Sequence, residues 1–173
     1  MVRRLRILFC LLPLILGGAK AANVEQIVKE ALPMATKIEP DKVILTRSEA
    51  QEVMRRAKMK LPSRLYRIFR IYRGKKVVAD GVVITRKVRS KKASVLYLFD
   101  HEGKLLFAEV LAFAEPSEFL PSKVWMGQFQ NKSPDAPLRV GKDIPTISGA
   151  TLSARNITDG ARLARALVEA VLR

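Results

Sequence analysis

The chain has almost no cysteine or histidine. Its 173 residues include one of each, Cys10 and His101. A structural zinc site needs about four Cys or His ligands. A disulfide needs a pair of cysteines, and attachment of c-type haem needs a Cys-x-x-Cys-His motif. The sequence therefore excludes all three kinds of site, and any redox function must come from a bound organic group.

Acidic residues are also scarce relative to basic ones. Lys and Arg number 32 against 16 Asp and Glu, which gives a formal net charge of +16. The basic side chains crowd residues 67–76 and 86–92. Such a face suits acidic redox partners or anionic lipid headgroups, and the alternative is an ordinary solvated surface. No recognised RNA- or DNA-binding module accompanies these runs, so we expect no nucleic-acid partner.

Long apolar runs are absent as well. The run Ile7–Leu16 has half of the roughly 20 residues that span a bilayer. Arginines precede it, and an Ala-x-Ala pattern ending at Ala21 follows it. This order is typical of a secretory signal peptide. We expect residues 1–21 to direct export to the periplasm or another extracytoplasmic compartment, either free or peripheral to the inner membrane. An uncleaved membrane anchor is the alternative.

The rest of the chain suits one domain, since 49% of the sequence is hydrophobic. Helical periodicity predicts a helix over residues 23–31. Thr46 and Glu49 have the spacing of a capping box, which predicts a second helix from there to about Met59. We therefore divide the chain into the signal peptide, an N-terminal helical segment (22–62) and a main domain (63–173).

The main domain begins with strand-like segments. They are rich in Val, Ile, Tyr and Phe, are separated by short turns and cover residues 65–72, 77–85, 94–99 and 105–113. Connections this short join antiparallel strands. A helix over residues 156–172 closes the chain. The predicted fold class is therefore α+β, an antiparallel sheet with helices packed on it.

About forty residues with little periodicity, 114–155, separate the last strand from the final helix. Loops this long inside a compact domain are usually functional or disordered. This one contains Ser148-Gly149-Ala150-Thr151, whose small residues let a ligand approach the backbone. Thr151 would place a hydroxyl at the start of the terminal helix, where unpaired N–H groups favour a phosphate. The alternative is a tight turn with a helix cap.

Two stretches resemble the FMN-binding domain family, which includes the flavin-carrying subunits of the Rnf and sodium-pumping NADH:quinone reductase complexes. Residues 124–173 carry Trp-x-x-x-Phe, APLRVGKDI and ISGATLSARNIT. Residues 74–118 carry Gly81, Asp100-x-x-Gly-Lys and Glu115-Pro116. Together they cover about one hundred residues, nearly all of the chain beyond the N-terminal helices.

The resemblance implies that FMN is attached to Thr151. In that family a Mg²⁺-dependent flavin transferase, using FAD, joins the FMN phosphate to the threonine of Ser-Gly-Ala-Thr. The family signal commonly has an acid six positions before the threonine, where this chain has Pro145; Asp143 lies two residues earlier. Noncovalent FMN binding therefore stays open as an alternative. A flavin transferase is the first partner that the resemblance implies.

We expect the cofactor-binding residues to lie in three places. Trp125 would stack on the flavin ring and Glu115 would touch its edge, although Trp125 could equally be a core residue and Glu115 a turn cap. The remaining candidates are Thr151 and its neighbours Ser148, Gly149, Ala150 and Leu152.

These features suggest an exported electron carrier that passes electrons between membrane or periplasmic proteins such as cytochromes. We assign no catalytic or metal-binding residue, and a redox subunit fits better than a self-contained enzyme. The first alternative is a sensory or assembly domain that binds FMN noncovalently. The second is a non-redox envelope protein that binds anionic surfaces through its basic residues.

Overall fold

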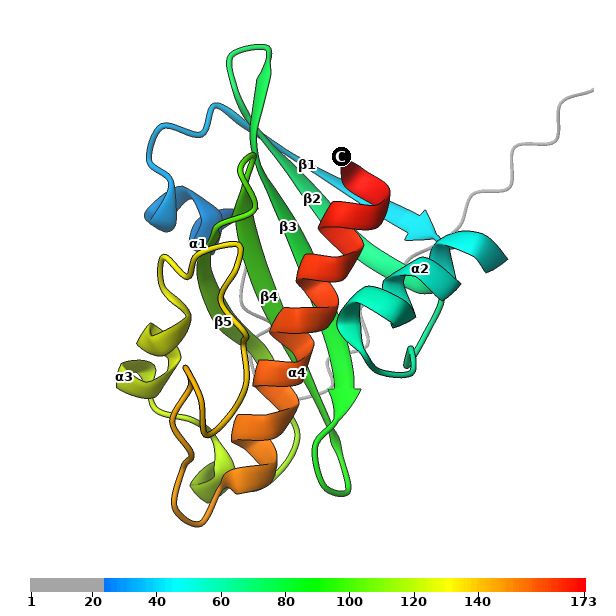
Figure 1. Ribbon diagram of the computed structural model, residues 1–173. Coiled ribbons are helices and arrows are strands. Elements are labelled where there is room, and N and C mark those ends of the chain that lie inside the picture. The colour runs from blue at the N-terminus through cyan, green and yellow to red at the C-terminus, as the bar shows by residue number, and fades with distance from the viewer. Residues whose placement is uncertain (1–23) are drawn as a thin grey trace, which may run out of the picture.

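The computed structural model describes residues 24–173. The expected signal peptide, residues 1–21, lies outside the described residues. Five antiparallel strands form one sheet in the order β1-β2-β3-β4-β5 (Figure 1). Their bounds are β1 (Lys37–Ile44), β2 (Leu65–Arg73), β3 (Lys76–Lys87), β4 (Lys92–Asp100) and β5 (Leu105–Phe113).

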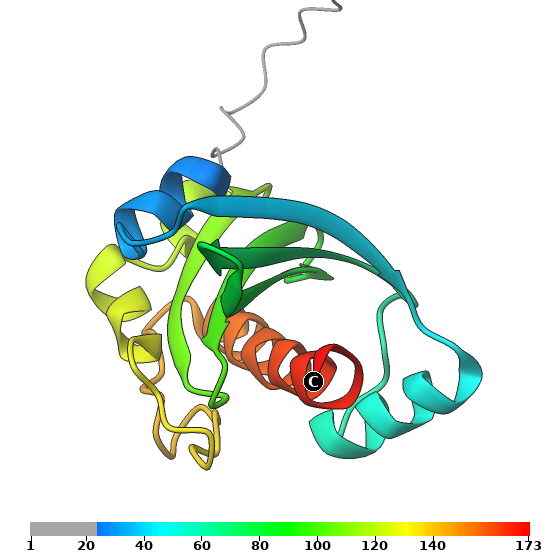
Figure 2. The same cartoon turned by 90° about the horizontal axis from the view of Figure 1, so that it is seen from above.

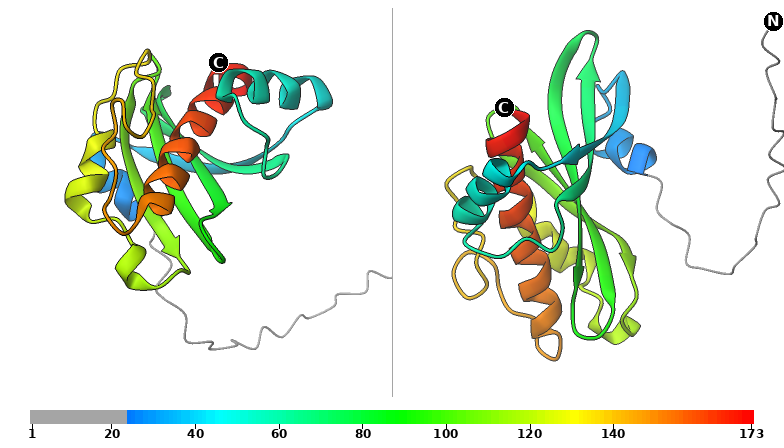
Figure 3. Two further views of the ribbon diagram at one scale, coloured as in Figure 1. Left: turned by 60° about the horizontal axis from the view of Figure 1, so that its bottom comes forward. Right: turned by 90° about the vertical axis from the view of Figure 1, so that its right-hand side faces the viewer.

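Helices cover the two faces of the sheet unequally. The long helix α4 (Thr151–Leu167) and α2 (Arg47–Ala57) lie side by side on one face, and α1 (Val24–Ala31) lies on the other (Figures 2 and 3). A π-helical turn, η3 (Val168–Leu172), continues α4 to the end of the chain. The predicted α+β class is therefore confirmed. No helix within residues 24–173 is long and apolar enough to cross a membrane.

The connection from β5 to α4 is compact. It contains the short helices η1 (Ser117–Phe119), α3 (Lys123–Met126) and η2 (Gly127–Phe129). After η2 the chain pairs with the start of β5, where Leu105 and Lys132 exchange backbone hydrogen bonds of 2.9 and 3.0 Å. The long segment that lacked periodicity is thus fastened along one edge of the sheet.

The main core fills the space between the sheet and the α2–α4 layer. Ile157 and Ala161 of α4 and Val53 of α2 are buried against it. Gly160 marks the closest approach of helix and sheet, because a Cβ atom there would lie 2.4 Å from the Tyr97 hydroxyl oxygen. That hydroxyl donates a 2.7 Å hydrogen bond to the Ile157 carbonyl. Helix α4 therefore lies directly on β4.

A smaller core lies on the opposite face, under α1. Val28 of α1 is fully buried there against side chains from the middle strands, including Phe69, Ile71 and Leu98. Helix α1 has 8 residues and covers part of this face, and no other helix within residues 24–173 packs on it (Figure 3). The two faces are thus buried to different extents.

The N-terminal segment contains more than the two predicted helices. Strand β1 lies between them and pairs with β2 from Leu65 to Tyr72, so this segment contributes the edge strand of the same sheet. This strand was not predicted, because Pro40 and the charged residues around it do not form the Val-, Ile-, Tyr- and Phe-rich pattern of the other strands. Proline lacks an N–H group and is tolerated at a sheet edge, which is where β1 lies.

The last helix begins earlier than predicted. We expected it from Asn156, and α4 starts at Thr151. Its first turn carries Thr151 and Ser153, and residues of this type have only a moderate helix propensity. The sequence Ser148-Gly149-Ala150 therefore ends directly at the helix N-terminus.

Candidate functional site

A cavity of about 310 Å³ lies where the N-terminus of α4 meets the turn between β3 and β4. Volumes of roughly 300–1,000 Å³ are usual for small-molecule sites, so this cavity is at the small end of that range. Its lining comes from three separate parts of the chain: Val88 and Arg89, Glu115 and Phe119, and residues 149–153. We call it the α4 cavity.

The first wall of the α4 cavity is the start of the helix. Ala150 occupies the N-cap position and no side chain caps the helix there. Gly149 has a φ of +76°, a conformation that favours glycine, and no atom lies within 4 Å of the position that a Cβ would take. The exposed Thr151 is the first helical residue. A helix of 17 residues therefore directs its positive end, free of a side-chain cap, toward the cavity.

The hydroxyl of Thr151 is available for chemistry but is not activated. Its hydrogen bond goes to the carbonyl of Ile147 over a long 3.4 Å. A nucleophilic hydroxyl needs an adjacent base, and none of the described side chains hydrogen-bonds to this one. Thr151 therefore presents an exposed hydroxyl that lacks the adjacent base of a catalytic nucleophile.

The second wall is held by Glu115. Its carboxylate is buried and accepts hydrogen bonds from the backbone N–H groups of Arg89, Ser90 and Lys91, at 2.9, 2.6 and 2.7 Å. The Ser90 hydroxyl adds a fourth bond at 3.1 Å. The bond from the Lys91 N–H, helped by the others, lowers the pKa of Glu115 to about 2. Glu115 thus caps the β3–β4 turn, the alternative considered from the sequence, and also lines the cavity.

Arg89 and Phe119 complete this wall. The Arg89 guanidinium lies over the Phe119 ring, 5.5 Å from its centroid. An aromatic ring and a cation that both face a cavity suit a planar, anionic ligand. Neither residue was among the expected cofactor-binding residues. Arg89 was visible in sequence only as one of several basic residues in its turn.

Trp125 lies in the core instead of the α4 cavity. It is 8% exposed, and its ring meets that of Phe129 edge to face with centroids 5.4 Å apart. Its indole N–H donates a 3.0 Å hydrogen bond to the Pro145 carbonyl. Trp125 therefore anchors the chain just before Ser148. Ser148 itself is exposed and does not line the cavity.

Asp143 shapes the same loop. Its carboxylate accepts the N–H groups of Leu138 and Arg139 at 3.1 and 2.8 Å and lies 3.8 Å from the Lys132 ammonium. Arg162 of α4 donates to the carbonyl of Leu138 at 3.0 Å. Asp143 is thus engaged in folding the loop that leads into Ser148-Gly149-Ala150-Thr151.

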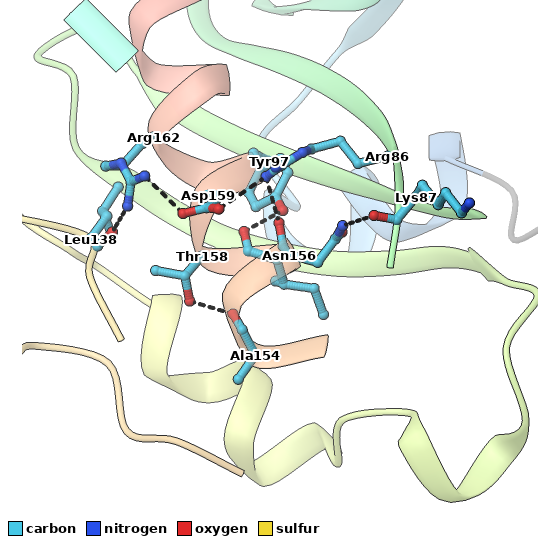
Figure 4. A network of polar contacts seen from close by, with 10 residues as sticks. Arg86, Lys87, Tyr97, Leu138, Ala154, Asn156, Thr158, Asp159 and Arg162 are labelled. Atoms are coloured by element: carbon cyan, nitrogen blue, oxygen red, sulfur yellow. Dashed lines mark hydrogen bonds and ion pairs between the residues drawn. The ribbon is translucent and has the colours of Figure 1, made fainter. Parts of the chain in front are cut away.

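A polar network fixes the distance between the two walls (Figure 4). The Asn156 side-chain amide donates to the carbonyl of Lys87 at 2.7 Å. Arg86 donates to the Asn156 carbonyl at 3.2 Å and lies 3.6 Å from Asp159, which also accepts from Arg162 at 2.7 Å. The network joins the first turns of α4 to the end of β3, so the cavity is built on two rigid elements.

The structure therefore brings together part of the predicted site. Thr151, Gly149, Ala150, Leu152 and Glu115 line one cavity, whereas Ser148 and Trp125 do not. Residues 24–173 contain no group of three or more His, Cys, Asp or Glu side chains that could hold a metal ion.

Compared with the models of known protein families and with the curated proteins, the chain matches none of them.

Proposed function

We propose that the protein is an exported flavoprotein electron carrier in which FMN binds in the α4 cavity and is attached through its phosphate to Thr151. The observation that supports this most is the position of Thr151. Its exposed hydroxyl is the first side chain of a long helix whose N-terminus has no side-chain cap, on the rim of a cavity.

The residues of the cavity suit the two halves of FMN. The uncapped N–H groups of the first turn and the helix dipole favour the phosphate. The Phe119 ring and the apolar Val88 and Leu152 side chains offer surfaces for a planar ring system, and Arg89 offers a cation for its polar edge. Gly149 leaves room beside the helix start, since a Cβ there would meet no atom within 4 Å.

The protein's own residues would hold and orient the cofactor. Glu115 keeps the β3–β4 turn, and with it Arg89, in place across the cavity from Thr151. Bound FMN would supply one- and two-electron chemistry that the protein's side chains lack. Attachment would prevent its loss in a compartment where FMN is not readily replaced. The expected partners are a flavin transferase and electron-transfer proteins such as cytochromes.

The test is a mass measurement on protein made in cells that also produce a flavin transferase. The peptide containing Thr151 should gain the mass of one FMN less one water. Thr151→Val, which keeps the shape of the side chain and removes the hydroxyl, should abolish the gain. Ser148→Ala is the matched control and should keep it, because Ser148 does not line the cavity.

Colour separates the alternatives. A yellow protein that loses its colour on unfolding, in both wild type and Thr151→Val, would replace covalent attachment with noncovalent binding. A colourless wild type after exposure to the transferase and FAD would overturn the flavin proposal altogether. Export is checked separately, by finding the protein outside the cytoplasm with its N-terminus at Ala22.

A further inference from the structure

The face of the sheet opposite α4 carries a second concave region, which the flavin proposal does not use. Helix α1 covers only part of this face (Figure 3). Beside it, the start of β2 and the parts of β3 and β4 near their shared turn hold an open groove of about 790 Å³. We call it the basic groove.

Five cations line the basic groove, and four of them are free of the α4 side: Lys42, Arg67, Lys87 and Lys92. None of these four forms an ion pair with any of the residues 24–173, and no Asp or Glu is among the lining residues. Unpaired cations gathered on a concave surface attract anions, and only a ligand from outside can neutralise them. Arg86 also borders the groove, but it is paired with Asp159 on the α4 side.

Apolar side chains stand beside these cations. Ile44 and Leu65 pair across the ends of β1 and β2, and they are 73% and 52% exposed. Large exposed aliphatic residues next to Lys and Arg are characteristic of surfaces that lie in a membrane interface. A surface that binds only small anions has no use for them.

The described part of the chain begins at this face. Val24, the first described residue, lines the basic groove. The apolar run of the N-terminal segment ends at Leu16, eight residues earlier. At roughly 3.3–3.6 Å per residue, this stretch spans less than about 30 Å. If residues 7–16 act as the expected signal peptide, a membrane that holds them would lie within this distance of the groove.

We infer that the basic groove binds the headgroups of anionic phospholipids and holds the protein on a membrane surface. Lys42, Arg67, Lys87 and Lys92 contact the phosphates, and Ile44 and Leu65 enter the interfacial layer. The α4 cavity then opens at the end of the sheet, on the far side of the β3–β4 turn, and stays accessible to protein partners. This inference does not depend on the flavin.

The experiment is cosedimentation with vesicles of equimolar phosphatidylcholine and phosphatidylglycerol, using the protein as it is recovered from cells that express the full chain. Each cation near an anionic surface contributes about a fivefold factor in binding, so Arg67→Gln with Lys92→Gln should weaken it roughly 30-fold. Both side chains are exposed, so folding should be unaffected. Vesicles of phosphatidylcholine alone should bind the wild type weakly.

The matched control removes the same charge from the other side of the molecule. Arg139→Gln with Lys142→Gln lies beside α2 and α4, and should change binding by no more than about twofold. If the two double variants weakened vesicle binding equally, binding would depend only on the net charge of the protein, and the inference would be overturned. Wild-type binding to soluble polyglutamate without binding to the vesicles would also overturn it, because it would indicate an acidic protein partner. Thr151→Val should bind vesicles like the wild type.

Discussion

The two faces of the sheet differ in how completely they are buried. On the α4 face, two helices and the loop after β5 enclose a continuous core. On the α1 face, one short helix covers a smaller core and leaves a row of cations in solvent. Helix α4, which forms one wall of the α4 cavity, is packed on the larger core, whereas the partial burial of the other face keeps charge accessible. One sheet thus carries the α4 cavity beside its larger core and the exposed basic groove on its other face.

The largest loss of stability is expected when the close packing on the α4 face is disturbed. Gly160→Ala places a methyl group 2.4 Å from the Tyr97 hydroxyl oxygen and forces helix and sheet apart. Overpacking of this kind lowers the free energy of unfolding by about 1–3 kcal/mol, and we expect the upper end. Denaturant unfolding of the purified protein measures it.

Gly127→Ala is the matched control. Gly127 has a φ of −56°, and no atom lies within 4 Å of its missing Cβ. The same added methyl group should leave stability unchanged or raise it slightly. Equal losses at Gly160 and Gly127 would contradict the close contact between α4 and β4.

Replacing one buried valine by alanine on each face tests whether the two cores contribute differently to stability. Val53 of α2 and Val28 of α1 are both fully buried. Val53→Ala should lower the global free energy of unfolding by about 2 kcal/mol, from lost burial and the cavity left behind. Val28→Ala should act mainly on α1, whose small core permits local opening. Hydrogen exchange separates the two cases.

Amides of α1 should exchange faster in Val28→Ala, while those of β3 and β4 keep their protection. In Val53→Ala all strongly protected amides should lose protection together. If Val28→Ala lowered protection evenly across the sheet, the two faces would be one cooperative unit and the contrast between them would disappear.

A smaller effect is expected at the wall of the α4 cavity. Glu115→Gln replaces three charge-assisted backbone bonds with weaker neutral ones. Exchange of the Arg89, Ser90 and Lys91 amides should accelerate roughly tenfold. Glu118→Gln, at an exposed neighbouring position, should leave these amides unchanged. Unchanged exchange in Glu115→Gln would show that the turn does not need the charge.

The smallest effect is a pH dependence. The folded protein holds the pKa of Glu115 at about 2, below the unfolded value of about 4.3. The stabilisation is therefore fully present above the unfolded pKa and is lost as the pH falls through the folded one. The stability difference between wild type and Glu115→Gln should shrink from pH ~4.3 to ~2. A difference that stays constant over this range would contradict the assigned bonds.

Local patterns predicted most of the fold. Strands β2 to β5 follow from runs of Val, Ile, Tyr and Phe, and α2 from the capping box that Thr46 forms. Strand β1 has no such pattern. Pro40 and its charged neighbours resemble a loop, and only pairing with β2 makes them a strand. The extended conformation of this segment therefore depends on its tertiary contacts, which cannot be read from the local sequence.

The candidate site was predicted in two parts, the continuous residues 149–152 and, through the family resemblance, Glu115. Gly149, Ala150 and Thr151 could be found because they are adjacent and small or hydroxylated. The partners of Glu115 could not, since they are backbone groups 24 to 26 residues away. Trp125 looked suitable for stacking, yet its indole N–H satisfies the Pro145 carbonyl inside the core.

Pro40 has a further consequence for how copies of the protein behave at high concentration. An edge strand normally offers free N–H and C=O groups to any extended chain that approaches, which is how sheets aggregate. Strand β1 interrupts this row with a proline and flanks it with Lys37, Glu39, Asp41 and Lys42. A second molecule that approaches β1 therefore meets a hydrogen-bonding edge that is interrupted by a proline and flanked by charged side chains.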